Sequence, residues 1–441
     1  NVVKGIASLF FVILILASSL FITALSNMTT VSGLDSSSTL SPADIISSSA
    51  IQKELTNSTS AFKITDEIKD SINALVDSNR TNAAIVIGIV DRDGTQFYSH
   101  GKISNAINST VDQNTIFAIG SNTKVFTTVL LAEMVEEGLV RLNDPIDKYL
   151  PSNVIVPQFK GHKITIEDLA THTSGLPEFP SNYCPSFAIS NAQTLEDKVQ
   201  HLRNLMGCTK NYTFDQLYQG LSNTTITREP GSKYEYSTFG LGLLGHILAL
   251  KSNMSSYNEL LKKRILDVLG MNSTSIILSD EQKSRLAIGH LSGRELPLLN
   301  MSNPLIPGGG LYSSANDLLK FISANTGLIQ TKLDSAMQAS HLIRHSTGLL
   351  TPNNIDISGK NTKIELYIGL GWLITTNFGN ELIWHNGALI DGYNAFMGFN
   401  PDTKRGIVVL CNTGTADVDI TTLGLNQEGK LSSLIWDLLS K

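Results

Sequence analysis

The stretch Thr115–Gly138 reads TIFAIGSNTKVFTTVLLAEMVEEG, and it predicts both the central helix of the fold and the first pair of candidate site residues. Ser121 and Lys124 stand three positions apart at the head of an apolar run, so on a helix their side chains share one face. The apolar residues that follow, at spacings that predict a buried helix, are Phe126, Val129, Leu130, Leu131 and Met134. Gly138 is placed to end this helix, because glycine accepts the left-handed backbone common after a helix C-terminus.

A serine with a lysine beside it on a buried helix is a candidate pair of nucleophile and base. The serine hydroxyl is a weak nucleophile until a neighbouring group takes its proton, and burial lowers the pKa of a lysine so that it can do so. The helix N-terminus also presents a backbone N–H to an anion forming on an attacked carbonyl. The same Ser-x-x-Lys spacing recurs at Ser60–Lys63 and Ser99–Lys102, where no long apolar helix follows. On this pattern alone, an ordinary buried helix remains the alternative.

Two further polar motifs stand at the ends of expected elements. The stretch KYEYSTFGLGLLGHIL places Tyr236 and Thr238 at the head of a second apolar helix. The stretch ELIWHNGALIDGY places His385, Asn386 and Gly387 at the end of an expected strand. Taken singly, a core tyrosine with a bonded hydroxyl and a structural histidine are the simpler interpretations. Together with the serine–lysine pair, the motifs indicate a catalytic site.

Short apolar runs at both ends of the chain predict one antiparallel sheet. Near the N-terminus, a helix over residues 65–79 precedes a hairpin whose turn is Asp93-Gly94. Near the C-terminus, four short strand-like runs precede a closing helix over Ser432–Lys441. The middle of the chain, from about 124 to 302, is mostly helical in pattern. The predicted fold class is α+β: an antiparallel sheet flanked by N- and C-terminal helices, plus a mostly helical lobe and a cleft between them.

The N-terminal residues predict an extracytoplasmic protein. Residues 6–25 carry no charge and are long enough, at a helical rise of ~1.5 Å per residue, to span a bilayer core of about 30 Å. We therefore expect residues 1–26 to be a membrane anchor or a cleaved signal segment, so the protein is either anchored to the membrane or secreted. Residues 27–63 are rich in serine and threonine and are expected to form a stalk, leaving 64–441 as the globular domain.

Three further features bear on location and partners. Nine Asn-x-Ser/Thr acceptor sites predict a glycoprotein: Asn27, Asn57, Asn79, Asn108, Asn211, Asn223, Asn253, Asn272 and Asn300. Cys184 and Cys208 flank one loop-rich stretch and are candidates for a disulfide, whereas Cys411 is expected to be a buried thiol. No cysteine pair has metal-ligand spacing, and we expect no metal or other cofactor. The net charge of −6, without a dense basic run, argues against nucleic acid as a partner.

These motifs resemble the penicillin-recognising serine enzymes: class C β-lactamases, D-alanyl-D-alanine carboxypeptidases, and the esterases and D-aminopeptidases of the same superfamily. The resemblance runs from Ile64 to Lys441, and its supporting segments occur in family order. They are GLVRLNDPIDKYLP, ITIEDLATHTSGLP, PGSKYEYSTFGLGLLG and PGGGLYSSANDLLKF. The fold it implies is that of the β-lactamase/transpeptidase group.

The resemblance also implies a role for each motif. Ser121 attacks a carbonyl carbon and becomes acylated. Lys124 and Tyr236 share the task of general base, and Tyr236 later protonates the leaving group and activates the hydrolytic water. The backbone N–H groups of Ser121 and Ala388 form the oxyanion hole.

Two departures from the family pattern concern the substrate-binding residues, which are expected to be Thr238, His385, Asn386 and Gly387. Thr238 stands where the family usually has asparagine, and a hydroxyl has less reach than an amide. His385-Asn386-Gly387 stands where class C β-lactamases carry Lys-Thr-Gly. Histidine is mostly neutral at pH 7, so it is a poorer anchor for a substrate carboxylate than a permanent cation.

The predicted function is that of a serine hydrolase that cleaves an amide or ester through an acyl-enzyme. We expect a small-molecule or peptide substrate and weak or no β-lactamase activity. The alternative is a membrane-anchored receptor or pseudoenzyme that binds ligand without turnover.

The stretch Pro180–Thr225 is expected to border the cleft. His172 and Ser174 in HTSGLP are too close along a turn to face each other, and the segment is interpreted as structural.

Overall fold

The computed structural model describes residues 63–78, 83–105, 109–184, 194–298, 304–350, 354–355, 361–362, 365–377 and 380–414, together with Leu439. The expected anchor or signal segment, the stalk and most of the closing helix lie outside these ranges. Among the residues described, no helix has both the length and the apolar character needed to cross a bilayer.

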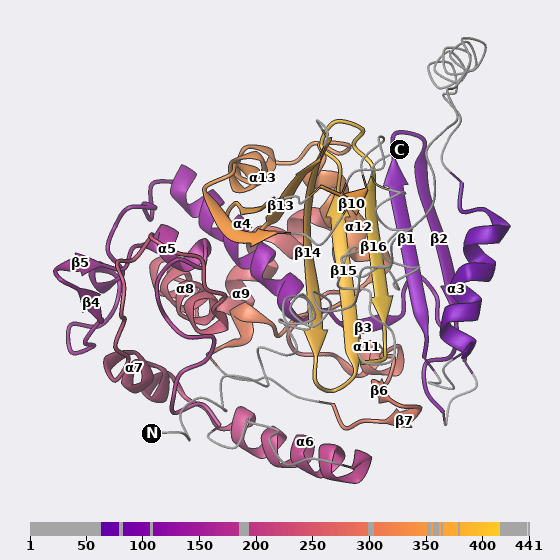
Figure 1. The fold of residues 1–441 in the computed structure, drawn as a ribbon, viewed down its shortest axis with the longest axis horizontal. Coiled ribbons are helices and arrows are strands. Elements are labelled where there is room, and N and C mark those ends of the chain that lie inside the picture. Colours follow the sequence, from indigo (N-terminus) through magenta and orange to yellow (C-terminus); the bar gives the residue numbers. More distant parts are fainter. Residues whose placement is uncertain are drawn as a thin grey trace, which may run out of the picture.

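One antiparallel sheet of eight strands is built from both ends of the chain, in the order β2-β1-β16-β15-β14-β13-β12-β9 (Figure 1). Its strands are β1 (Ile85–Asp91), β2 (Gly94–His100), β9 (His345–Leu350), β12 (Glu365–Ile368), β13 (Leu373–Asn377), β14 (Asn380–Leu389), β15 (Tyr393–Phe399) and β16 (Gly406–Cys411). The pairing of β1 with β16 joins the N-terminal hairpin to the C-terminal strands. The predicted hairpin and the predicted single sheet are both confirmed.

Strands β1 and β16 are apolar along most of their length because both faces of the sheet are covered. In β1, Ile85, Ile87 and Ile89 pack in one cluster with Ile72 of helix α3 (Asp66–Ser78). Val86 and Val90 belong to the cluster on the other face, which includes residues of helix α12 (Ala315–Asn325). Leu439, the described residue of the expected closing helix, is buried on the α3 side.

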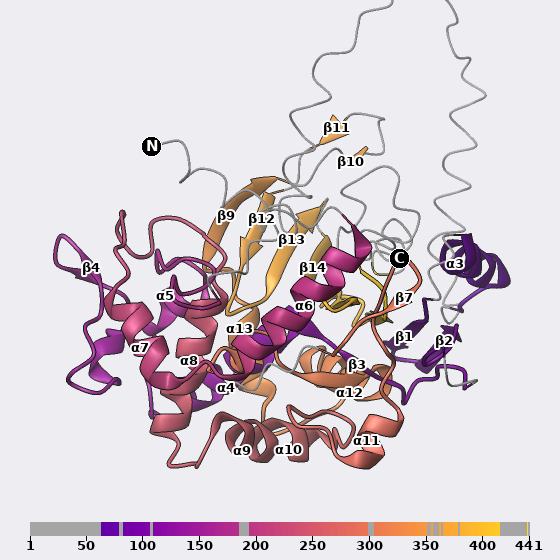
Figure 2. The ribbon, with the colours of Figure 1, turned by 90° about the horizontal axis from the view of Figure 1, so that it is seen from below.

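Two short strands, β3 (Ile116–Ala118) and β8 (Tyr312–Ser314), pair with each other. The chain between them is mostly helical. Its helices are α4 (Thr123–Glu136), α5 (Ile166–Ala170), α6 (Leu195–Lys210), α7 (Phe214–Ser222), α8 (Thr238–Lys251), α9 (Tyr257–Leu261), α10 (Asp267–Leu269) and α11 (Asp280–Ser284). Helices α12 and α13 (Asp334–His341) follow β8. The short hairpins are β4 (Gln158–Phe159) with β5 (His162–Lys163), β6 (His290–Leu291) with β7 (Arg294–Glu295), and β10 (Asn354–Ile355) with β11 (Asn361–Thr362). Figures 1 and 2 both show α5, α7 and α8 grouped at the opposite end of the molecule from β2 and α3. The lobe boundaries at 124 and 302 remain a prediction.

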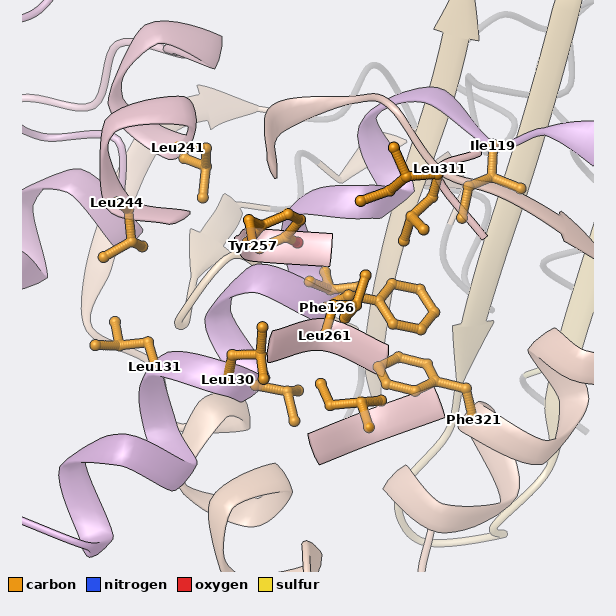
Figure 3. Packing of buried hydrophobic residues seen from close by; sticks show 14 of the residues in the cluster. Ile119, Phe126, Leu130, Leu131, Leu241, Leu244, Tyr257, Leu261, Leu311 and Phe321 are labelled. Carbon is orange, nitrogen blue, oxygen red and sulfur yellow. The ribbon is translucent and has the colours of Figure 1, made fainter. Parts of the chain in front are cut away.

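Helix α4 runs through the middle of the core, and every residue from Thr123 to Met134 is buried. Phe126 stacks on Phe321 of α12 with 4.0 Å between ring centroids, and Leu130 and Leu131 lie in the same packed cluster (Figure 3). The helix ends as predicted, with Gly138 in the left-handed region at φ 72°. A side chain at the start of this helix is therefore held in a dry, rigid environment.

Candidate active site

Ser121 and Lys124 meet where the chain turns from β3 into α4. Gly120 takes a positive φ of 51°, which lets the chain turn sharply into the 3₁₀ turn Gly120–Asn122. Ser121 is half-buried in this turn, and Lys124 in the first turn of α4 is 0% exposed. The Nζ of Lys124 lies 3.2 Å from the Oγ of Ser121. The predicted neighbouring positions of the two side chains are confirmed.

The buried amine of Lys124 has three hydrogen-bonding neighbours. Besides Ser121, Nζ lies 3.2 Å from the Oγ1 of Thr238 and donates to the carbonyl oxygen of Gly308 at 2.5 Å. Burial lowers the pKa of Lys124 to about 7. A neutral amine has two N–H donors and one lone pair, so donation to Thr238 and Gly308 leaves the lone pair for the hydroxyl proton of Ser121.

Tyr236 approaches the same serine from the loop before α8. Its hydroxyl donates to the Oγ of Ser121 at 2.5 Å, and the Nζ of Lys124 lies 4.5 Å from its ring centroid. Ser237 caps α8 by accepting the N–H of Gly240, which fixes the chain directly after Tyr236. Burial raises the pKa of Tyr236 well above 10. At neutral pH this side chain is therefore a phenol that donates a hydrogen bond, and Lys124 is the stronger candidate for the first base.

Glu178 adds a carboxyl group to the surroundings of Lys124. Burial raises the pKa of Glu178 to about 8, although the positive charge of Lys124 acts to lower it. The carboxyl group is therefore mostly protonated at pH 7. Its charged form acts to raise the pKa of Lys124, against the larger effect of burial.

The third motif lies on the part of β14 that runs beyond its neighbour β13. The pairing of the two strands ends at Trp384, so residues 385–389 pair with β15 on one side alone within the described residues. The other edge faces the turn that carries Ser121. A Cβ added to Gly387 would lie 3.0 Å from the amide nitrogen of Ser121, and one added to Gly120 would lie 3.3 Å from that of Ala388. The two predicted oxyanion-hole residues are thus brought together.

His385 is buried and neutral. Its Nδ1 lies 2.6 Å from the carbonyl oxygen of Asn386, so Nδ1 carries the proton and Nε2 is an acceptor. Burial, with a smaller contribution from the charge of Lys124, lowers the pKa of His385 to about 3. The expectation that this histidine is uncharged at pH 7 agrees with its surroundings. The substrate-binding roles of His385, Asn386, Gly387 and Thr238 remain predictions.

Sequence reasoning missed two contributors to the site. Gly308, in the supporting segment PGGG, supplies the carbonyl acceptor for Lys124; its motif was recognised but gave no sign of that role. His172, interpreted as structural, lies against Tyr236 with 4.7 Å between ring centroids. Ser174 is a local turn residue, accepting the N–H of Leu176, as its position predicted.

The two neighbouring cysteines are joined. Cys184 and Cys208 form a disulfide that links the segment after α5 to α6. Cys411 is a buried thiol in β16. The predicted disulfide between Cys184 and Cys208 and the predicted buried thiol of Cys411 are both confirmed.

Comparison with known proteins identifies a matching family and similar proteins. The beta-lactamase family model matches residues 69–426. The D-alanyl-D-alanine-carboxypeptidase/endopeptidase AmpH of Escherichia coli K12 is 28% identical over 353 residues, covering 79% of this chain and 83% of that protein. Protein flp of Staphylococcus aureus MRSA252 is 25% identical over 373 residues, covering 83% of this chain and 67% of that protein.

Solved structures share the fold. A β-lactamase/D-alanine carboxypeptidase from Yersinia pestis, complexed with citrate, superposes with a TM-score of 0.64 at 22% identity, covering 86% of this chain and 99% of that one. A class C β-lactamase from Rhodobacter sphaeroides gives a TM-score of 0.61 at 20% identity, covering 79% and 95%. Since the family match spans most of the 441 residues, this chain belongs to the beta-lactamase family and is a serine hydrolase.

Proposed function

We propose that the protein hydrolyses an amide or ester through an acyl-enzyme on Ser121, with Lys124 as the base that activates it. The observation that carries this proposal is the position of the Ser121 Oγ, which lies 3.2 Å from a fully buried amine and 2.5 Å from the Tyr236 hydroxyl. The pKa of Lys124, about 7, gives a large neutral fraction at physiological pH. The same surroundings argue against a receptor without turnover.

The proposed steps follow from the donors and acceptors around Ser121. Neutral Lys124 takes the hydroxyl proton as Oγ bonds to the carbonyl carbon, and the new oxyanion accepts the N–H groups of Ser121 and Ala388. The bond to the leaving group then breaks, and Tyr236 gives that group its proton. The proton held by Lys124 restores Tyr236. In the second half, water loses a proton to the pair Lys124 and Tyr236 as its oxygen bonds to the acyl carbon. The bond between that carbon and the Oγ of Ser121 then breaks, and the pair returns the proton to Oγ.

We propose that the substrate is a short peptide or an ester rather than a β-lactam. The relative in Escherichia coli is named a D-alanyl-D-alanine carboxypeptidase/endopeptidase, which supports a peptide. His385 is neutral where class C β-lactamases have a lysine, so this chain lacks the permanent cation that would hold a β-lactam carboxylate at that position. Parallel assays with D-amino-acid peptides, short-chain esters and a chromogenic cephalosporin separate the classes. Rapid cephalosporin hydrolysis would contradict the proposal.

A fluorophosphonate probe tests the nucleophile directly. We expect the wild type to be labelled at Ser121 and Ser121→Ala to lose labelling and hydrolysis by about 10³-fold or more. The control is Ser99→Ala, which removes the serine of a Ser-x-x-Lys decoy on β2 and should change neither property. Undiminished hydrolysis by Ser121→Ala would refute the assignment.

We also propose an extracytoplasmic location, with the protein anchored to the membrane by residues 6–25 or secreted after their cleavage. The disulfide Cys184–Cys208 supports an oxidising compartment. The acceptor asparagines Asn211, Asn223, Asn253 and Asn272 are exposed, as glycosylation requires. Glycosidase treatment and membrane fractionation of the full chain test both points. A reduced protein of unmodified mass in the cytosolic fraction would contradict them.

A further inference from the structure

His172 holds the chain on both sides of Tyr236. Its carbonyl oxygen accepts the N–H of Glu235 at 2.7 Å, and its side-chain Nδ1 accepts the N–H of Ser237 at 3.0 Å. These are the two residues that flank Tyr236. One residue therefore fixes the backbone immediately before and immediately after the tyrosine whose hydroxyl reaches Ser121.

The imidazole of His172 also covers the tyrosine ring. The two rings are tilted by 30° with 4.7 Å between centroids, while Tyr234 meets the imidazole edge-on at 5.7 Å. His172 is 1% exposed. The Tyr236 ring therefore packs against a rigid, dry partner, which limits the directions in which its hydroxyl can point.

The protonation state of this histidine follows from its contacts. Because Nδ1 accepts a backbone N–H, it carries no proton, and the proton of the neutral ring is on Nε2. Burial lowers the pKa of His172 well below 6.5, and the positive charge of protonated Lys124 acts in the same direction. The ring stays neutral throughout the working pH range, so Nδ1 remains an acceptor.

Two features of His172 lower the stability of the fold, and a residue that served packing alone would not need them. Within the described part of the chain, its buried Nε2 has no hydrogen-bond partner, and a phenylalanine would avoid that cost. Its backbone has a φ of 58°, a left-handed conformation that is unfavourable for a residue other than glycine. This conformation is held by the neighbouring turn, where Thr173 accepts the N–H of Gly231 and Pro177 accepts the hydroxyl of Ser237.

From this geometry we propose that His172 is a positioning residue that orients the Tyr236 hydroxyl toward Ser121 through its bond to the Ser237 N–H and its ring contact. The proposal rests on the role of Tyr236 proposed above. It assigns to the HTSGLP segment a function in the reaction, acting through the tyrosine and without contact to the substrate.

Two substitutions separate the parts of this role. His172→Phe keeps a flat ring and removes the acceptor for the Ser237 N–H. His172→Asn keeps an acceptor oxygen near the position of Nδ1 and tolerates a positive φ, but removes the ring. His341→Phe is the matched control, because His341 is a buried histidine in α13 that contacts Asn325 and lies outside the site.

The readout is the rate of ester hydrolysis per active site, where sites are counted by fluorophosphonate titration, with Tm measured alongside. A residue with a purely structural role would lower Tm and the number of titratable sites, but not the rate at each site. We expect His172→Phe to lower kcat per titrated site by about 10- to 100-fold with a smaller change in KM, since misplacing a catalytic group by ~1 Å costs that much. His172→Asn should retain more activity than His172→Phe, and His341→Phe should lower Tm without lowering kcat per site.

A rate per site for His172→Phe equal to that of the wild type would overturn the proposal, whatever happens to Tm. Equal losses in His172→Phe and His172→Asn would overturn the part assigned to the hydrogen bond. The variants Tyr236→Phe and Ser121→Ala distinguish failure of the role proposed for His172 from failure of the proposed function. If Tyr236→Phe matches the wild type, the roles of Tyr236 and His172 both fail; if Tyr236→Phe is inactive and His172→Phe has the wild-type rate per site, the role of His172 alone fails. Undiminished hydrolysis by Ser121→Ala would refute the proposed function itself.

Discussion

The amine of Lys124 donates a hydrogen bond of 2.5 Å to the carbonyl oxygen of Gly308, which is 184 positions further along the chain. This bond fixes Nζ inside the core with one N–H directed away from Ser121. Because the second N–H points to Thr238, the lone pair of the neutral amine is left for the serine. The contact therefore links the packing of two distant segments to the basicity of the site.

The first prediction concerns the pH dependence of stability. Burial lowers the pKa of Lys124 to about 7 from 10.5 in an unfolded chain, so between these values the unfolded chain binds more protons. The free energy of unfolding of the wild type should therefore rise with pH relative to Lys124→Met, by up to about 1.4 kcal/mol per pH unit between pH 7 and 10. Denaturant titrations at several pH values measure the difference.

The control for this experiment is Lys283→Met, on the solvent-facing side of α11. Its stability should run parallel to that of the wild type across the same pH range. Parallel curves for Lys124→Met as well would show that Lys124 binds protons equally in the folded and unfolded chain, contrary to our account.

The second prediction concerns Thr238. Because its hydroxyl contacts the Nζ of Lys124, Thr238→Val should free that amine to turn away from Ser121. We expect kcat to fall by about tenfold, because the free energy of one such hydrogen bond corresponds to a factor of about ten in rate. KM should change little. Thr347→Val removes a buried hydroxyl that donates to Leu366 in the sheet, and should leave both constants unchanged. A raised KM at constant kcat would instead make Thr238 a substrate-binding residue alone.

The third prediction concerns the contact between β14 and the serine turn. A Cβ on Gly387 would lie 2.1 Å from the carbonyl oxygen of Ile119, so Gly387→Ala must push the strand away from the turn. We expect a loss of about 1–3 kcal/mol in the free energy of unfolding and a fall in kcat of about 10²-fold or more, because the oxyanion-hole N–H groups move apart. Gly207→Ala in α6, with open space around it, should leave kcat at the wild-type value. Full activity in Gly387→Ala would show that this close approach is not needed.

The sequence predicted the parts of the site that depend on local spacing. Ser121 and Lys124 are neighbours because three residues make almost one helical turn, and the strand-like run before His385 places that motif at the end of β14. The β1–β16 pairing was predictable as well, since apolar runs at both chain ends need a common sheet to bury them.

Contacts between distant segments could not be predicted in the same way. The Gly308 carbonyl meets Lys124 only because two segments with no shared pattern pack together. The turn spacing around His172 gave no information about its contact with the ring of Tyr236, 64 positions later. The raised pKa of Tyr236 could not be predicted for a similar reason, because it depends on burial by several elements together; the general-base role shared by Lys124 and Tyr236 stays a prediction.

The pH dependence of Ser121 labelling tests the central claim most directly. Reaction with a neutral fluorophosphonate requires Lys124 in its neutral form, and the pKa of Lys124 is about 7. The second-order labelling rate should rise about tenfold per pH unit below that value and level off above it, with the adduct on Ser121 by peptide mass spectrometry. A rate that is unchanged from pH 5 to 9, or an adduct on another residue, would contradict the account.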